Sequence, residues 1–197
     1  MYLLYDNINN YTIKDYNKCK VNLNKNDKIK YNKLVKNNNR KLLLLSRMLL
    51  YRILEDKYNI NYNDMDVHYN RYGKPFIDNI YFNISHSYDY AVVCTSNKRI
   101  GIDIEKIREV NLNTINYFCT DKEKEYIINS GDKYKSLFEL FCLKEAYFKM
   151  LGSNLSDIKN IEFIINNNTI RCTQDENINI EIKYDIDNYI IAIIEEK

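Results

Sequence analysis

The chain has 197 residues, of which 45% are hydrophobic, and its formal net charge is +2. This length suits one large domain or two small lobes that share a core, and the apolar content excludes wholesale disorder. A charge so close to zero argues against a protein that coats nucleic acid along its whole surface, so we expect no nucleic-acid partner.

Strand-like and helical runs alternate along the first half of the chain. Residues 27–36 and 40–57 have helical periodicity, and residues 37–39, all Asn, are expected to separate the two helices. The expected strands are residues 1–6, 67–69, 81–84, 90–95 and 99–105. The short polar turn at residues 96–98 predicts a hairpin between the last two of these strands.

The second half begins with two short helices, over residues 111–118 and 121–129. The longest helical pattern covers residues 133–151, and Gly152 is expected to end it. Three strand-like runs follow, over residues 161–165, 178–182 and 189–194. Since the order of strand, helix and strands occurs roughly twice, we expect an α+β fold with two similar α/β lobes, residues 1–96 and 97–197, related by a pseudo-two-fold.

Several features bear on the cellular compartment. The N-terminal apolar run is too short for a signal peptide, and Arg47 interrupts the most apolar stretch, which favours a core helix and no membrane span. Five scattered cysteines without a CxxC pair favour reduced thiols, so we expect a cytoplasmic protein. With only two histidines and no ligand spacing, a zinc site is not expected.

The run from Arg99 to Glu105 alternates between apolar and other residues. Side chains two apart on a strand share a face, so Asp103 and Glu105 should point the same way while Ile102 and Ile104 point into the core. Two neighbouring carboxylates repel each other unless a cation lies between them or both remain in water. A solvated strand face is the alternative, and a bare DxE pattern by itself favours it.

A second acidic position lies in the longest helix. Glu145 and Lys149 are four residues apart on one helical face, and Glu145 lies among Phe141, Cys142 and Phe148. A carboxylate on such an apolar stripe normally has a partner, because burying it alone costs several kcal/mol. An ordinary surface Glu–Lys pair is the alternative. Magnesium, which takes oxygen ligands and is typically completed by substrate phosphates, would account for all three acids.

These motifs resemble a known family. The segments Ile100–Glu105 and Lys144–Lys149 together resemble the signature of the 4'-phosphopantetheinyl transferases, and Tyr72–Pro75 followed by Phe82–Ser87 is similar to the surfactin-type branch. The motifs occur in the order of the family. The family usually has a Trp three residues before the Lys-Glu pair, where this chain has Phe141, and we expect this difference to affect packing only.

The resemblance implies a holo-[acyl-carrier-protein] synthase activity, in which the 4'-phosphopantetheine arm of coenzyme A (CoA) is transferred to a serine of an apo acyl or peptidyl carrier protein, releasing 3',5'-ADP. It implies that Asp103, Glu105 and Glu145 hold Mg²⁺ against the CoA pyrophosphate. Glu145 would also be the general base, and Lys149 would stabilise the leaving group. CoA would lie in a cleft between the lobes, so that a monomer suffices.

The resemblance also implies further contacts with CoA. Ser85 and His86 would bind a phosphate, although a lone His is otherwise more often a satisfied core residue. Because adjacent strand residues project oppositely, these two are not expected to form a nucleophilic dyad. Lys74 and Lys144 would contact phosphates as well. A basic cluster would bind the 3'-phosphate, and its candidates are Lys25, Lys28 and Lys41, with Arg40 as an alternative to Lys41.

The stretch from Val110 to Thr120 is expected to contact the carrier. Val110, Leu112, Ile115 and Phe118 could expose an apolar ridge there, and the neighbouring Lys106 and Arg108 could steer an acidic carrier helix.

Two other classes of function remain open from the residues. One is a Mg²⁺-dependent phosphohydrolase that uses the same acids. The other is a non-catalytic binding module built on the basic residues 18–40, which alternate with Asn and Asp and lack the aromatic residues that stack on bases.

Overall fold

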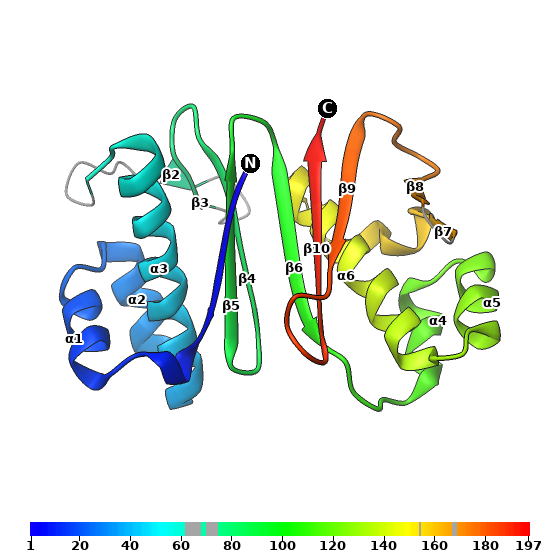
Figure 1. Cartoon of the computed structure of the whole chain (residues 1–197), viewed down its shortest axis with the longest axis horizontal. Coiled ribbons are helices and arrows are strands. Elements are labelled where there is room, and N and C mark those ends of the chain that lie inside the picture. Colours follow the sequence, from blue (N-terminus) through cyan, green and yellow to red (C-terminus); the bar gives the residue numbers. More distant parts are fainter. Residues whose placement is uncertain (62–67, 70–74, 154, 167–168) are drawn as a thin grey trace.

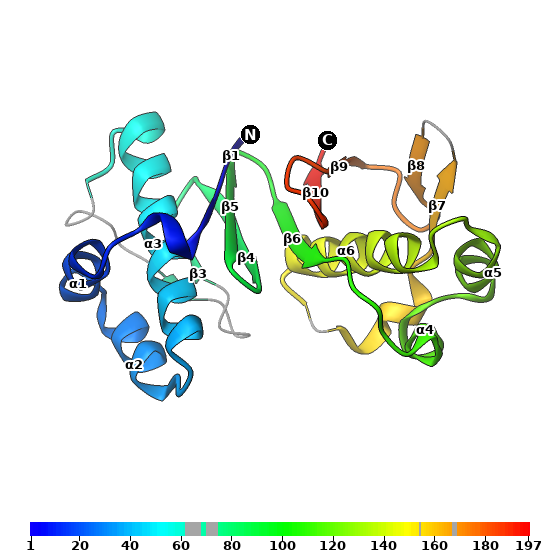
Figure 2. The same ribbon diagram turned by 60° about the horizontal axis from the view of Figure 1, so that its bottom comes forward.

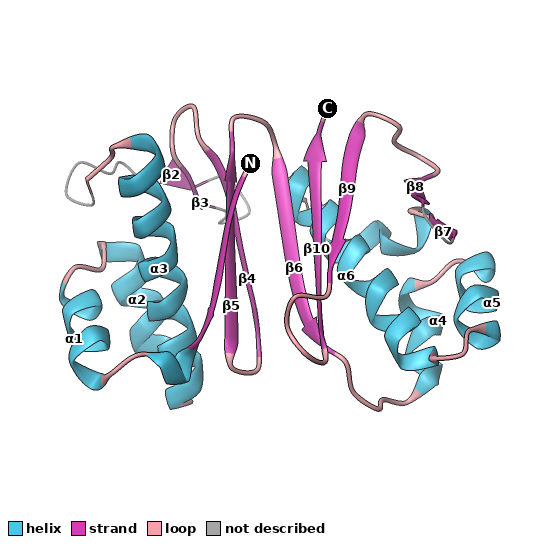
Figure 3. Ribbon diagram, viewed as in Figure 1, coloured by secondary structure: helices cyan, strands magenta, loops and turns pink. Residues whose placement is uncertain are grey.

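The computed structural model describes residues 1–61, 68–69, 75–153, 155–166 and 169–197. Two three-stranded antiparallel sheets stand next to each other in the middle of the molecule, and the main helices lie on the two outer sides (Figures 1 and 3). This arrangement confirms the expected α+β class. In the described part of the chain, no helix combines the length and the apolarity needed to span a bilayer.

The N-terminal half builds the first sheet, in the strand order β1-β5-β4. Its elements are β1 (Tyr2–Asn7), η1 (Ile8–Asn10), α1 (Ile13–Val21), α2 (Lys25–Lys33), α3 (Asn37–Tyr58), the short strands β2 (His68–Tyr69) and β3 (Pro75–Phe76), β4 (Tyr81–Ser87) and β5 (Tyr90–Ser96). Helix α3 covers one side of the sheet (Figures 1 and 2).

The C-terminal half builds the second sheet, in the order β6-β10-β9. Its elements are β6 (Ile100–Lys106), η3 (Leu112–Thr114), α4 (Ile115–Phe118), α5 (Asp121–Asn129), α6 (Lys133–Leu151), η4 (Leu155–Asn160), β7 (Phe163–Asn166), β8 (Thr169–Cys172), β9 (Ile178–Lys183) and β10 (Tyr189–Glu196). In both sheets the last strand in the sequence lies between the first and the second-last. We keep the division into residues 1–96 and 97–197 as a proposal.

The expected hairpin between residues 90–95 and 99–105 is wrong. Strand β5 pairs with β1 and β4, whereas β6 pairs with β10. The hairpin partner of β5 is β4, through a two-residue turn at Tyr88 and Asp89. Residues 97–99 therefore carry the chain from one sheet to the other.

The helices of the N-terminal half differ from expectation, and α2 ends three residues before the expected residue 36. Helix α3 begins at Asn37, so the three asparagines form its first turn. This is physically acceptable, because the first N–H groups of a helix have no intrahelical partner. Helix α1 was not expected, although Thr12 and Asp15 form a reciprocal capping box at its start.

Three apolar clusters stabilise the molecule. One packs α3 against the first sheet around Leu45 and Leu54, and a second packs α6 against the second sheet around Leu143. The third lies between the sheets, where Val92 of β5 and Ile102 of β6 are both fully buried. The two halves therefore share a core as well as having their own. All five cysteines are free and buried.

Candidate functional site

Strands β4 and β6 belong to different sheets but lie alongside each other, and side chains join them. The Ser85 hydroxyl donates to Asp103 Oδ1 at 2.7 Å, and the Ser87 hydroxyl donates to Glu105 Oε2 at 3.0 Å. Asn83 Oδ1 accepts a hydrogen bond from the backbone N–H of Ile102 at 3.4 Å. Both acids thus project from the same face of β6, as predicted, toward alternate residues of β4.

Helix α6 lies directly on β6 because residue 101 is glycine. A Cβ atom there would lie 1.9 Å from the carbonyl oxygen of Ala146 and 2.4 Å from the backbone nitrogen of Met150. This close approach brings Lys149 to Asp103, where Nζ and Oδ1 are 2.6 Å apart, and Nζ also donates to the Ser85 hydroxyl at 3.0 Å.

A pocket of about 260 Å³ lies where these elements meet. Its lining residues are Ile84, Ser85, His86, Asp103, Glu105, Phe141, Glu145 and Lys149. Strand β4 belongs to the N-terminal half, whereas β6 and α6 belong to the C-terminal half, so the pocket is built from both. Six of the candidate site residues predicted from the sequence lie here together: Ser85, His86, Asp103, Glu105, Glu145 and Lys149.

The acids of the pocket are poorly hydrated and close together. Burial raises the pKa of Glu105, and the negative charge of Asp103 raises it further, against the opposing effect of Ser87 and Arg108. Burial and the charge of Asp103 likewise raise the pKa of Glu145, against the effect of Lys149. Carboxylates this close repel one another, and a cation between them would relieve the repulsion.

The two cationic candidates have opposite pKa shifts. Burial by itself lowers the pKa of Lys149, but the charge and hydrogen bond of Asp103, together with the charge of Glu145, outweigh it, and the pKa of Lys149 is raised. Burial and the charge of Lys149 lower the pKa of His86. This shift favours the neutral imidazole, which can still donate one N–H.

The donor set suits Mg²⁺, which prefers carboxylate oxygens. Asp103 is 4% exposed, and its Oδ2 atom is buried without a hydrogen-bond partner among the described residues. An unpartnered buried carboxylate oxygen is costly unless a ligand binds it. Within the described ranges, however, no three His, Cys, Asp or Glu side chains are close enough to form a metal site as they stand.

A larger pocket, of about 480 Å³, adjoins the first and shares Ile84 and His86 with it. Its other lining residues are Lys30, Lys33, Leu34, Asn39, Leu43, Ser46 and Arg47. Sequence reasoning missed Lys30 and Lys33, although residues three apart on a helix share a face. A buried ion pair fixes α2 against α3 here, since two nitrogens of Arg47 each lie 2.6 Å from an oxygen of Asp27.

The expected basic cluster does not line this pocket. Lys25 and Lys28 are exposed on α2, and Lys41 Nζ lies 5.8 Å from the ring centre of Tyr16. Arg40 donates through Nε to the carbonyl oxygen of Leu34 at 2.8 Å. A contact between Lys25, Lys28 or Lys41 and a 3'-phosphate stays a prediction. Lys74, with its turn, lies outside the described residues.

The structure places Lys144 away from the pocket, with its ammonium group fully buried. It forms an ion pair with Glu123 at 2.7 Å and donates to the carbonyl oxygens of Phe118, Ile158 and Ile161 at 2.6–3.0 Å. The ammonium group has three N–H donors, and these four partners use all of them. Lys144 therefore ties α6 to the segments around it, and these contacts do not support its predicted contact with a phosphate.

The expected apolar ridge after β6 is also wrong. Ile115 and Phe118 are 6% and 7% exposed and belong to the core of the C-terminal half, and Val110 and Leu112 pack against that core. The large side chain that this stretch exposes is Tyr117, at 77%.

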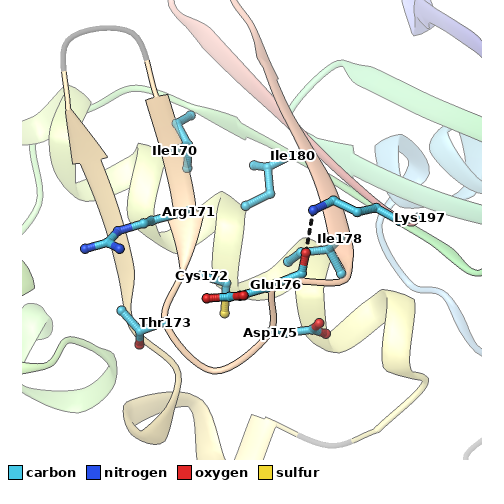
Figure 4. Close-up of a pocket in the computed structure, with 9 residues that line it drawn as sticks. All are labelled: Ile170, Arg171, Cys172, Thr173, Asp175, Glu176, Ile178, Ile180 and Lys197. Carbon is cyan, nitrogen blue, oxygen red and sulfur yellow. Dashed lines mark hydrogen bonds between the residues drawn. The ribbon is translucent and has the colours of Figure 1, made fainter.

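A third pocket, of about 400 Å³, lies between β8 and β9 in the C-terminal half (Figure 4). It holds charges of both signs, including Arg171, Glu176 and Lys197, and the Lys197 ammonium donates to the carbonyl oxygen of Glu176. Burial raises the pKa of the Cys172 thiol, which argues against a reactive thiolate. No residue that the sequence singled out lies here.

Comparisons with known proteins identify relatives of this chain. A family model described as the 4'-phosphopantetheinyl transferase superfamily matches residues 99–194, and a model described as 4'-phosphopantetheinyl transferase, N-terminal, matches residues 11–98. A solved structure of the holo-[acyl-carrier-protein] synthase of Thermotoga maritima is similar with 20% identity and a TM-score of 0.44, over 50% of this chain and 62% of that one.

Curated relatives carry the same family name. The chain is 36% identical to the 4'-phosphopantetheinyl transferase gsp of Aneurinibacillus migulanus, over 57% of this chain and 48% of that protein. It is 26% identical to the 4'-phosphopantetheinyl transferase Sfp of Bacillus subtilis, over 71% of this chain and 62% of that protein. The matched region thus spans about half to three fifths of each relative's length. Since the two family models together cover residues 11–194, the chain belongs to the 4'-phosphopantetheinyl transferase superfamily, with relatives of the surfactin type.

Proposed function

We propose that the chain transfers the 4'-phosphopantetheine arm of CoA to a serine hydroxyl of an apo acyl or peptidyl carrier protein. The observation that carries this proposal is the pocket between the two halves, in which β4, β6 and α6 gather three carboxylates, a lysine and a histidine. Because one chain supplies both sides of the pocket, the proposal includes a monomer. The names of the relatives support the same activity.

In the proposed reaction the serine oxygen attacks the phosphorus that carries the pantetheine arm. The new bond is serine O–P, and the P–O bond to the adenosine phosphate breaks, so that 3',5'-ADP leaves. The pKa of Glu145 is raised in the direction of neutral pH, which makes its carboxylate a better base, and this carboxylate accepts the serine proton. The Lys149 ammonium donates to the leaving phosphate oxygen and balances its charge.

Asp103, Glu105 and Glu145 would hold Mg²⁺, which would supply Lewis-acid neutralisation of charge on the pyrophosphate oxygens. Support comes from the unpartnered Oδ2 atom of Asp103 and the raised pKa values of both glutamates. Excess EDTA should abolish carrier modification, and added Mg²⁺ should restore it. Full activity in EDTA would contradict this part of the proposal.

CoA would occupy the two adjoining pockets, with His86 between them. The reacting pyrophosphate would lie near Glu145 and Lys149, and the adenosine end would reach toward Lys30 and Lys33. The neutral imidazole of His86 would donate one N–H to a phosphate oxygen. The opposite charges of CoA phosphates and these lysines support this orientation.

The carrier would contact the stretch from Val110 to Thr120, which follows β6. With Ile115 and Phe118 buried, the exposed ring of Tyr117 is the apolar group that supports this proposal. Replacing Tyr117 by Ala should raise the Michaelis constant for the carrier and leave that for CoA unchanged, as measured by steady-state kinetics.

The deciding experiment is a mass spectrum of an apo-carrier protein after incubation with this chain, CoA and Mg²⁺. We expect the carrier serine to gain one phosphopantetheine group and 3',5'-ADP to appear in equal amount. A Glu145→Gln sample is the matched control. Release of phosphate or nucleotide from CoA with an unmodified carrier would instead identify the phosphohydrolase that the acids alone leave open.

A further inference from the structure

Each acid on β6 has one oxygen engaged by protein groups and one that is not. Asp103 Oδ1 accepts from Ser85 and Lys149, and its Oδ2 has no partner in the described part of the chain. Glu105 repeats this pattern. Its Oε2 accepts from Ser87 at 3.0 Å and from Arg108 Nη1 at 3.3 Å, and no described residue donates to its Oε1.

Arg108 is held in place from several directions. Its Nη1 atom also donates to the carbonyl oxygen of Lys106 at 2.9 Å, and its guanidinium lies 4.6 Å from the ring centre of Phe138 and 5.6 Å from that of Tyr88. The side chain of Arg108 is 37% exposed, and its guanidinium is nevertheless restrained by its proximity to two rings and by its ion pair with Glu105.

The turn between β4 and β5 contributes to this arrangement. Tyr88, the first residue of that turn, has a φ of 52°, in the left-handed region that favours glycine and is strained for a bulky side chain. The guanidinium of Arg108 lies over the Tyr88 ring, and Tyr88 directly follows Ser87 in the chain. Backbone strain of this kind persists where the surrounding structure holds it, often beside functional groups.

We propose that Ser87 and Arg108 are positioning residues that hold Oε2 of Glu105 and thereby keep Oε1 available as a ligand for a divalent cation. This inference rests on the proposed metal at the pocket and adds two residues to its support. Ser87 lies in the N-terminal half, so that half helps to orient a ligand carried by the other. The inference also gives Arg108, which was expected at the carrier surface, a role behind Glu105, since Arg108 contacts that acid without lining the pocket.

Manganese binding tests the inference directly. Mn²⁺ is titrated into the wild-type chain, Ser87→Ala, Arg108→Met and Lys106→Met, with and without saturating CoA, and free Mn²⁺ is measured by electron paramagnetic resonance. Removing a residue that orients a metal ligand typically weakens affinity about 10–100-fold, which we expect for Ser87→Ala and Arg108→Met. Lys106→Met is the matched control and should bind as wild type, because Lys106 Nζ lies over the same Tyr88 ring, at 5.0 Å, without an ion pair to Glu105.

Turnover provides a second measurement. For Arg108→Met, turnover at limiting Mn²⁺ should fall and recover at excess Mn²⁺, with the Michaelis constant for the carrier unchanged. If the Michaelis constant for the carrier rose and excess Mn²⁺ did not restore it, the inference would be overturned and Arg108 would instead be assigned to carrier binding.

Other outcomes separate the inference from the proposed function. If wild type binds Mn²⁺ but Ser87→Ala and Arg108→Met stay within about twofold of it, well short of the usual loss, the inference fails alone. If wild type and Glu105→Gln both bind no Mn²⁺, the metal proposal fails and this inference with it. Circular dichroism checks folding, and if Arg108→Met unfolds, Ser87→Ala, which removes a single oxygen, decides.

Discussion

The Glu145 carboxylate accepts no hydrogen bond from the residues that the structure describes, and burial with the charge of Asp103 raises its pKa. A group in this state suits proton transfer from a serine. We therefore expect Glu145→Gln to lower turnover on an apo-carrier by ~10²–10⁴-fold, the usual contribution of a general base. The dissociation constant for CoA, measured by calorimetry, should change far less, since the proposal gives CoA contacts with several other groups as well.

Glu139→Gln is the matched control for this variant. Glu139 lies on the same helix and is also buried, but its carboxylate accepts from Tyr184 at 2.5 Å outside the pocket, and a glutamine oxygen can accept the same bond. Its turnover should stay near wild type. If the turnover of Glu145→Gln also stayed within about threefold of wild type, far less than the loss expected for a general base, Glu145 would be a structural residue.

Lys144 gives a prediction about stability. Replacing it by Met leaves the Glu123 carboxylate buried without its cation, which typically costs about 3–5 kcal/mol. Urea unfolding followed by circular dichroism should show this loss. Lys135→Met, which removes an exposed partner 4.0 Å from Glu139, should change stability by less than about 1 kcal/mol. Equal losses in the two variants would contradict the structural role of Lys144.

Among elements, the packing of α6 on β6 depends on a single missing Cβ. Gly101→Ala places a methyl group against backbone atoms of Ala146 and Met150, which cannot rotate away. We expect a loss of about 1–3 kcal/mol or more from overpacking, together with lower turnover, because Glu145 and Lys149 move with α6. Thermal melting and carrier modification measure the two effects.

Gly131→Ala is the control for this substitution. A Cβ at Gly131 meets no atom within 4 Å, and its φ is not positive. Reducing the freedom of the unfolded chain should then leave stability unchanged or raise it by up to about 1 kcal/mol. A Gly101→Ala variant as stable as Gly131→Ala would show that α6 does not need this close approach.

The elements differ in how far local sequence predicts them. Helix α6 has the predicted bounds, because its periodicity is long and Gly152, with a φ of 67°, ends it. The pairing of β6 is not predicted, because the polar turn at residues 96–98 resembles a hairpin turn, whereas β6 pairs with β10 at the far end of the chain. Antiparallel partners so distant in sequence leave no local signal.

The residues of the candidate site also differ in how far local sequence predicts them. The shared face of Asp103 and Glu105 and the helical spacing of Glu145 and Lys149 were readable from periodicity, which is local. The roles of Ser87 and Arg108 were not, since each acts through contacts that only the folded chain brings together. The burial of Lys144 is not predicted either, because Lys144 directly precedes Glu145 but faces another side of α6.

The whole molecule has a core between its two sheets, and this core gives the last prediction. Ile102 of β6 is fully buried there with Val92 of β5, so its side chain belongs to both halves. Ile102→Ala should cost about 2–5 kcal/mol. If the halves unfold as one cooperative unit, amides in α3 and in α6 should lose the same amount of protection from hydrogen exchange, because both exchange through the same global opening.

Ile128→Ala is the comparison, because Ile128 is 55% exposed on α5 and its loss should change protection by less than about 0.5 kcal/mol. If Ile102→Ala lowered protection in α6 and left α3 unchanged, the halves would unfold separately. The pocket between them would then open without unfolding either half, and the bonds from Ser85 to Asp103 and from Ser87 to Glu105 would form only while the halves are docked. Equal losses in both helices instead mean that the shared core keeps these hydroxyls and carboxylates together for as long as the chain is folded.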